Sequence, residues 1–453
     1  MSKTSKTQMV KEYIFNEAEA GRIKSGKRLP SCREVAAKLS VNKLTVNKAY
    51  HELESEHKVF SIPRGGFYLV DCGEKRLIAR KPLDFITVKP DEKLIPYREF
   101  THVINKAVDL YKDSLFEYES TAGLTTLRDT LMNMFQQEGI YTTADRIVIT
   151  HGAQQAINLV LQAIFQNNKG KLIVEVPTYG LALEYASYLG IDVIGIERKE
   201  NGFDYHELEL LFKQGDILAF YVIPRHHNPT GYRLSESHKK IIAELAGKYN
   251  VLVIEDDYLA DVGYRKGSMP IHYYDIKKQV VYIRSFSKTF MPGLRLGAAV
   301  LPESIIESVT KLKKLSDLNT SRLPQAALDI FIKSGMYEKQ VKKVRKSYEA
   351  KLNKAREILL SLSPSELSWH VPEYGIFIWL RLPEYVNINT LEKKLESQGI
   401  LIKSAREFFL KQEIVQEDNV NHLNYIRLCI SGIPEADISS IAAIVSAIHS
   451  FDV

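Results

Sequence analysis

The segment SFSKTFMPGLRLG, residues 285–297, carries a single lysine, Lys288, between small hydroxyl residues and a glycine-containing turn. The run that leads into it, VVYIRSF (280–286), is typical of a buried strand. A buried ammonium group is costly unless it is paired or loses its proton. Lys288 is therefore either an ordinary lysine of a surface loop or an amine kept for Schiff-base chemistry, with the serines and Arg295 holding a phosphate beside it.

Short apolar runs alternate with helical patterns beyond residue 95. They are RIVIT (146–150), LIVEVP (172–177), ILAFYVIP (217–224), VLVIEDD (251–257), VVYIRSF (280–286) and LGAAVLP (296–302). Continuous apolar strands separated by helices indicate an α/β fold with a mostly parallel sheet covered on both faces. Because ligand-binding groups gather at strand ends in such folds, the residues that follow these runs are the candidate site.

Three of the motifs at strand ends are weak signals when taken alone. In HGAQQA, the residues Gly152, Ala153 and Gln154 open a helix, where backbone amides and the helix dipole favour an anion. In PTYG, Tyr179 is either a packing aromatic or a ring that stacks on a planar cofactor. In HHNPTG, Asn228 lies in a turn fixed by proline and glycine, and it need be no more than a turn residue.

Two further motifs place charge at or inside apolar strands. VLVIEDDY ends in Asp256 and Asp257, and a buried carboxylate there needs a cationic or protonated partner such as a pyridinium nitrogen. A solvated acidic loop is the alternative. In LNYIRLCIS, Arg427 interrupts an apolar run, where a bound carboxylate would satisfy its guanidinium through two hydrogen bonds.

In this order, GAQQA, PTY, NPTG, DDY, SFSK, RLG and YIRL resemble the motifs of the fold-type-I aminotransferases, which use pyridoxal 5′-phosphate (PLP). The resemblance covers roughly residues 95–450. It implies that Lys288 forms a Schiff base with PLP and that Asp256 keeps the pyridine nitrogen protonated, so that the ring acts as an electron sink. It also implies that Tyr258 and Asn228 bond the phenolic oxygen and that Tyr179 stacks on the ring.

The same resemblance implies the remaining contacts. The phosphate would be held by Ser285, Ser287, Arg295 and the amides of Gly152, Ala153 and Gln154. Tyr118, in FEYESTAGLTTLR, would reach the phosphate of a neighbouring subunit, so the chain is expected to form a homodimer. Arg427 would hold the carboxylate of the ligand.

The net charge of +6 is confined to the first seventy residues. This stretch has 13 lysines and arginines against seven glutamates and no aspartate, whereas the remaining residues hold 48 basic and 48 acidic side chains. A basic module attached to a neutral body suggests nucleic acid as the partner.

The basic stretch has the outline of a winged helix-turn-helix. Residues 7–20 place Met9, Val10, Tyr13, Ile14 and Ala18 on one helical face. Ser31 and Glu34 stand at the spacing of a capping box, and Asn42 can cap a third helix whose apolar positions are Val46, Ala49, Tyr50 and Leu53. VFSIPRGGFYLV then reads as a small hairpin.

RLPSCREVAAKLSVNKLTVNKAYHEL and PRGGFYLV resemble the GntR-type DNA-binding domain and its wing. The side chains that could reach phosphates or base edges are Ser31, Arg33, Thr45 and Lys48, with Arg64, Gly65 and Gly66 in the wing. A small protein-interaction domain is the alternative. Many members of the family have arginine where this chain has Asn47, which puts one DNA contact in doubt.

The two parts together resemble the MocR/GabR-like transcriptional regulators. We predict a winged helix-turn-helix domain over residues 1–72, a linker over 73–94, and a PLP-binding effector and dimerisation domain over 95–453. A DNA-binding regulator that senses an amino compound or PLP is favoured over a working aminotransferase that carries a DNA-binding head. A PLP-binding structural protein without affinity for DNA fits the basic head poorly.

The remaining features point to a cytoplasmic protein. No signal peptide and no run of about 18 apolar residues is present, so no membrane partner is expected. The three cysteines are far apart and form no CxxC pair, which argues against a disulfide framework, and no metal site is predicted.

Overall fold

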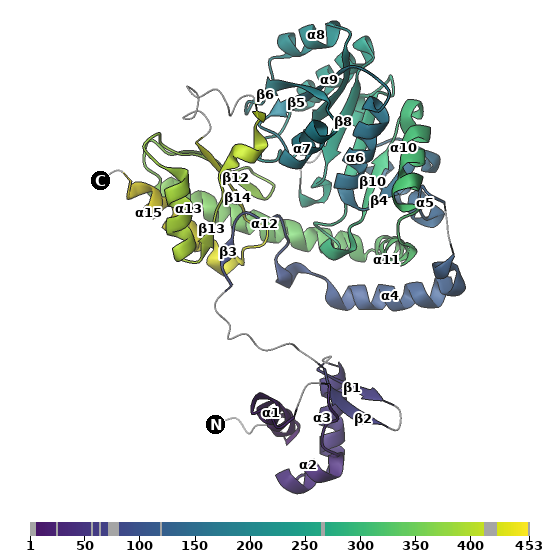
Figure 1. Cartoon of the computed structure of the whole chain (residues 1–453), viewed down its shortest axis with the longest axis vertical. Coiled ribbons are helices and arrows are strands. Elements are labelled where there is room, and N and C mark those ends of the chain that lie inside the picture. The colour runs from purple at the N-terminus through teal and green to yellow at the C-terminus, as the bar shows by residue number, and fades with distance from the viewer. Residues whose placement is uncertain are drawn as a thin grey trace. The chain divides into compact units, whose positions relative to one another are not determined.

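A computed structural model describes residues 6–23, 26–55, 58–62, 65–70, 81–117, 120–263, 268–411 and 424–451. The chain forms two compact units, Met1–Lys81 and Pro82–Val453, which are described separately below and are drawn in Figure 1. We refer to the first as the head and to the second as the large unit. Within the described residues, no helix is long and apolar enough to cross a membrane.

The head is a winged helix-turn-helix, as predicted. Its elements are α1 (Lys6–Glu19), α2 (Cys32–Leu39), α3 (Lys43–Ser55) and the antiparallel hairpin of β1 (Val59–Ile62) and β2 (Gly66–Leu69). The four predicted apolar positions of α3 are all buried. In α1, Val10 and Ile14 are buried one turn apart, but Met9 is 38% exposed because it lies at the edge of the stripe that they define. Met9 therefore lies at the exposed edge of the predicted apolar face.

Side-chain caps fix where the second and third helices begin. Ser31 Oγ accepts the Glu34 N–H at 3.3 Å and Glu34 Oε2 accepts the Ser31 N–H at 2.7 Å, which is the predicted capping box. Asn42 Oδ1 accepts the Leu44 N–H at 2.8 Å at the start of α3. These caps orient the exposed first turns of α2 and α3.

The large unit is built on a seven-stranded sheet of order β4-β10-β9-β8-β7-β5-β6. All pairs are parallel except those of β10, which runs antiparallel to β9 and β4, so the sheet is mostly parallel, as predicted, but mixed. The strands are β4 (Ile147–Thr150), β5 (Lys171–Val176), β6 (Asp192–Glu197), β7 (Ile217–Val222), β8 (Leu252–Asp257), β9 (Val280–Ser285) and β10 (Gly297–Val300). The six predicted runs are all strands, whereas β6 is an additional edge strand with exposed acids at both ends.

Helices cover both faces of this sheet (Figure 1). One face packs on α6 (Gly152–Phe165), α7 (Gly180–Tyr188) and α10 (Glu303–Asp317). The opposite face of the sheet packs on two groups of helices. The first core contains α8 (Tyr205–Lys213) and α9 (Glu236–Tyr249). The second contains α4 (Tyr97–Tyr111), α5 (Thr125–Gln137) and α11 (Arg322–Lys333). Neighbouring residues of a strand, such as Leu172 and Ile173, therefore enter different cores.

A smaller layer follows the long helix α12 (Met336–Leu362). It consists of the antiparallel strands β11 (Ser368–His370), β12 (Phe377–Arg381) and β14 (Tyr425–Cys429), packed with α13 (Ile388–Ser397) and α15 (Ile441–His449).

Part of the predicted linker, residues 83–94, is packed on the large unit. Its strand β3 (Leu83–Asp84) pairs in parallel with β13 (Ile400–Leu401), and Phe85 and Leu94 are buried. The charge and prolines of this stretch suggested a linker, but its few apolar residues hold it to the large unit. Residues 73–80 of the predicted linker lie outside the described residues.

Candidate functional site

Asp256, the last residue but one of strand β8, has a fully enclosed carboxyl group. Tyr221, on the neighbouring strand β7, donates its hydroxyl to Asp256 Oδ2 at 2.7 Å. Asp256 Oδ1 is buried and has no hydrogen-bond partner among the described residues. Burial raises the pKa of Asp256 to about 7, against the opposing effect of the Tyr221 hydrogen bond. The site therefore has one carboxylate oxygen that can accept a further donor.

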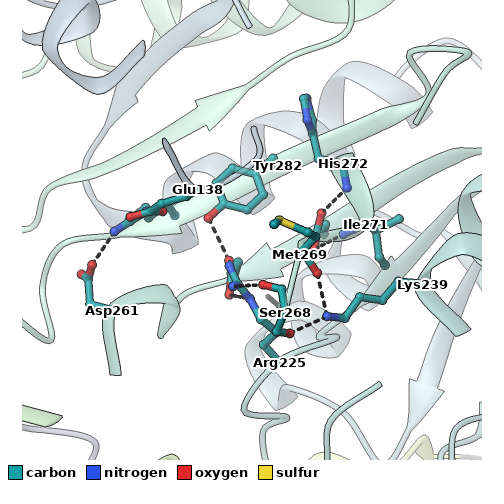
Figure 2. A network of polar contacts seen from close by, with 12 residues as sticks. Glu138, Arg225, Lys239, Asp261, Ser268, Met269, Ile271, His272 and Tyr282 are labelled. Carbon is teal, nitrogen blue, oxygen red and sulfur yellow. Dashed lines mark hydrogen bonds and ion pairs between the residues drawn. The ribbon is translucent and has the colours of Figure 1, made fainter. Parts of the chain in front are cut away.

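The next residue, Asp257, points to the opposite face of the sheet and belongs to a structural network. Its carboxylate pairs with Arg225, whose Nε donates to Oδ1 at 3.1 Å, and it accepts the Tyr282 hydroxyl at 2.8 Å. Figure 2 shows this network from close by, with Arg225, Tyr282, Ser268 and Lys239 among the labelled residues. Arg225 holds the pKa of Asp257 below its ordinary value despite burial. The two adjacent acids thus differ, because Asp257 is fully paired within the protein whereas Asp256 keeps one oxygen without a partner among the described residues.

Lys288 lies half-buried just beyond the end of β9, between the buried residues Ser287 and Thr289. Its Nζ donates to the carbonyl oxygen of Val88 at 2.7 Å. Burial lowers the pKa of Lys288, and the charges of Arg295 and Arg427 lower it further. Unlike a lysine of a solvated surface loop, this amine lies in an environment that favours its neutral form.

The start of α6 adjoins Arg295. Gly152 has φ +76°, and a Cβ built on it would lie 3.6 Å from Arg295 Nη2, so the guanidinium lies against the first turn of the helix. Ala153 and Gln154 continue that turn. The Ser285 hydroxyl accepts the Ser287 N–H at 3.3 Å, and Ser287 Oγ is buried with no partner in the described part of the chain. A helix start beside a guanidinium is suited to an anion.

Arg427, on strand β14, is buried between two aromatic rings. Its guanidinium carbon lies 4.6 Å from the ring centroid of Phe377 and 4.8 Å from that of Phe408. Nη1 donates to Asn228 Oδ1 at 2.8 Å and Nη2 donates to the Ile86 carbonyl at 2.7 Å. Two predicted residues from distant parts of the sequence are therefore in direct contact.

A cavity of about 1010 Å3 opens beside Asn228 and Arg427. Tyr179, Asn228 and Arg427 line it, together with Ile86, Val88 and Glu407. Burial raises the pKa of Tyr179 to about 12, so its hydroxyl stays protonated at neutral pH. Tyr258 lies behind the Asn228 turn, where its hydroxyl donates to the His226 carbonyl at 2.9 Å.

Sequence reasoning missed three contributors to this site. Tyr221 looked like a packing residue of an apolar strand, and only the strand order brings it to Asp256. The backbone carbonyls of Ile86 and Val88 lie in a stretch interpreted as linker, and a main-chain acceptor leaves no signal in the side-chain sequence. Tyr118 and Arg64, both predicted to contact ligands, lie outside the described residues.

The head presents its predicted DNA-binding residues on the surface. Ser31, Arg33 and Lys48 are exposed, and Thr45, Gly65 and Gly66 are partly exposed. Gly66 has φ +91°, and a Cβ there would lie 2.9 Å from Arg28 Nε, so Arg28 packs across the wing. Asn47 faces inward enough to accept the Cys32 thiol at 3.9 Å.

Comparisons with known proteins agree with this geometry. The profile of "Bacterial regulatory proteins, gntR family" matches residues 6–69, and that of "Aminotransferase class I and II" matches residues 93–445. The chain is 37% identical to the uncharacterized HTH-type transcriptional regulator YcxD of Bacillus subtilis, over 91% of this chain and 93% of that protein. The chain belongs to the GntR-family HTH-type regulators that carry an aminotransferase domain. This confirms the predicted MocR-like architecture, a DNA-binding transcriptional regulator with a PLP-type domain.

Other relatives match each part of this architecture. The HTH-type transcriptional regulator NorG of Staphylococcus aureus is 25% identical over 88% of this chain and 98% of its own length. A crystal structure of the kynurenine aminotransferase of Pyrococcus horikoshii superposes with a TM-score of 0.75 and 26% identity, over 82% of this chain and 92% of that one. That structure is described as a complex with PMP, which indicates a cofactor of the PLP class for this fold.

Proposed function

We propose that the large unit binds PLP covalently through Lys288, and that PLP and an amino compound together control the DNA affinity of the head. The observation that carries this proposal is the buried Asp256 oxygen with no partner among the described residues. A protonated pyridine nitrogen is the donor that such an oxygen fits. PLP bound there would supply an electron sink for bonds at an amino-bearing carbon.

Tyr221 would orient the carboxyl group that binds the pyridine nitrogen, and Lys288 would supply the amine that binds PLP covalently. The Tyr221 hydroxyl fixes the direction of the Asp256 carboxyl group and favours its ionised form. The lowered pKa of Lys288 increases the fraction of neutral amine, which is the nucleophilic form. Tyr258 and Asn228 would bond the phenolic oxygen, and Tyr179 would stack on the ring.

The phosphate would lie at the start of α6. The amides of Gly152, Ala153 and Gln154, the guanidinium of Arg295 and the hydroxyls of Ser285 and Ser287 supply the donors. We further propose a homodimer in which Tyr118 of each subunit completes the phosphate site of the other.

Arg427 would recognise the carboxylate of the amino compound. Its Nε is buried without a partner among the described residues, and its other nitrogens are held by Asn228 and Ile86. Contacts with the rings of Phe377 and Phe408 would fix the orientation of the guanidinium plane that an incoming carboxylate meets. An effector acts on DNA binding only if its affinity differs between two states of the protein.

The experiment is cofactor trapping at a single lysine. The purified protein is saturated with PLP, treated with borohydride and digested for peptide mapping, and we expect the phosphopyridoxyl group on Lys288. A label on another lysine, or none, contradicts the proposal. Absorbance titration with amines and amino acids then identifies compounds that react in the pocket.

Transamination is the second candidate function. It is favoured by the presence of both Lys288 and Asp256 and by the similarity to the Pyrococcus horikoshii enzyme. Steady-state assays with a panel of amino and keto acids separate the two functions. A regulator stops after one half-reaction at most, whereas an aminotransferase continues to turn over.

A further inference from the structure

Among the described residues of the head, Leu44 is the most exposed large apolar side chain, ahead of Met9, Phe60 and Ile62. It is 74% exposed and lies in the first turn of α3, next to the exposed residues Asn42 and Lys43. The apolar core of the head does not include it. Single exposed leucines are common on protein surfaces, so exposure alone carries no inference.

The position of Leu44 on the helix is more informative. The buried residues Val46, Ala49, Tyr50 and Leu53 define the inner face of α3. At 3.6 residues per turn, Leu44 lies almost opposite that face, in line with Lys48 one turn later and His51 beyond it. Lys48 and His51 are also exposed. The exposed side of α3 formed by Leu44, Lys48 and His51 therefore begins with an apolar side chain and continues with basic ones.

The cap at Asn42 holds this first turn in place. Its Oδ1 accepts the Leu44 N–H at 2.8 Å, so the backbone that carries the leucine is fixed. In a helix-turn-helix protein, the second helix of the motif, which is α3 in this chain, contacts base edges in the major groove with the residues of its first turn. The apolar group on that edge of DNA is the C5-methyl group of thymine.

We infer that Leu44 is a specificity-determining residue that contacts a thymine methyl group in each half-site of the operator. Lys48, on the same stripe, contacts the phosphate backbone and supplies affinity without sequence preference. The inference rests on the proposed DNA binding of the head, with α3 as the recognition helix that enters the major groove in a helix-turn-helix protein. It adds an apolar contact to the polar set predicted from the sequence.

The test removes the methyl group alone. Binding sequences are first selected from random DNA with the full-length protein, and each thymine of the half-site is then replaced by deoxyuridine. Fluorescence anisotropy at one salt concentration measures the affinity. We expect one thymine whose replacement weakens the wild-type protein about fourfold, which corresponds to about 0.8 kcal/mol for one buried apolar carbon.

The variant L44A should bind the thymine and deoxyuridine probes equally. L360A is the matched control, because Leu360 is a 70% exposed leucine on α12, and it should keep the wild-type preference for thymine. Circular dichroism checks that both variants are folded. A wild-type protein indifferent to every thymine replacement, or L44A with an unchanged preference, overturns the inference.

A third variant separates failure of the inference from failure of its premise. If K48A weakens binding and reduces the salt dependence while deoxyuridine has no effect, α3 enters the groove but Leu44 does not read the methyl group. If neither K48A nor deoxyuridine has an effect, α3 does not enter the groove. If L44A changes the sedimentation of the protein and leaves the methyl preference intact, Leu44 packs against protein. Each result overturns the inference for a different reason.

Discussion

The head and the large unit place their candidate functional groups in opposite environments. Arg33, in the capped first turn of α2, and Lys48, in the middle of α3, are both exposed to solvent. Asp256 and Arg427 of the large unit are buried among packed strands and rings. Function in the head can therefore change without a change in stability, whereas in the large unit the groups that would bind a ligand also contribute to the free energy of unfolding.

Replacement of Lys288 should have the largest effect on the large unit and none on the head. K288A removes the amine that would hold PLP, so borohydride should fix no cofactor, while DNA affinity measured without PLP should stay at the wild-type value. K351M is the matched control, because Lys351 is a fully buried lysine paired with Asp91 at 3.1 Å. Loss of labelling in K351M alone, with full labelling in K288A, would reverse the assignment.

Removal of the Asp257 charge tests the structural half of the comparison. D257N takes away the negative charge that faces buried Arg225, and we expect a loss of about 3–5 kcal/mol in the free energy of unfolding. Both tryptophans, Trp369 and Trp379, lie in the large unit, so tryptophan fluorescence during urea unfolding follows that unit.

E338Q is the control for this experiment. Glu338 forms a surface ion pair with Lys342, and its loss should leave the free energy of unfolding nearly unchanged, because solvent screens an exposed pair. Equal effects of D257N and E338Q would show that the buried network contributes no more than a surface pair.

The raised pKa of Asp256 predicts a particular dependence of stability on pH. Its folded pKa of about 7 lies above the unfolded value, so its contribution is fully present below the ordinary aspartate range and is lost as the pH rises toward 7. In PLP-free protein, the folding equilibrium constant of the wild type should fall relative to that of D256N by about tenfold per pH unit in this window. Identical slopes for the two proteins would show that the carboxyl group is not raised.

The smallest expected effect is that of R33A in the head on the free energy of unfolding. R33A should cost about 1–3 kcal/mol of DNA binding if Arg33 reads a base edge, and should change the free energy of unfolding by less than about 0.5 kcal/mol. If Arg33 contacts phosphate only, affinity should fall uniformly across sequences and the salt slope should decrease by about one. R22A, which removes an exposed arginine paired with Glu17 at 2.9 Å, should leave binding unchanged.

The sequence predicted the elements of the head and six strands of the seven-stranded sheet because their signals are local. Ser31 with Glu34 marks a helix start, and continuous apolar runs such as ILAFYVIP mark strands that are covered on both faces. The contacts within the candidate site are not local. Tyr221 meets Asp256 through strand order, Arg427 meets Asn228 across about two hundred residues, and Val88 meets Lys288 through a backbone carbonyl. Met9 could not be assigned for a different reason. The helical period predicts which residues share a face of α1, but it does not predict which of them at the edge of that face are exposed.

The most direct test of control by the pocket is DNA affinity measured with the pocket filled. Fluorescence anisotropy with DNA from the region upstream of the coding sequence should be recorded for the full-length protein alone, with PLP, and with PLP plus each amine or amino acid that changes the absorbance spectrum. We predict that at least one combination shifts the affinity by about 5- to 150-fold, and that R427A and K288A lose the shift while keeping their basal affinity. Specific DNA binding with the same affinity under every pocket ligand would contradict control of the head by the large unit.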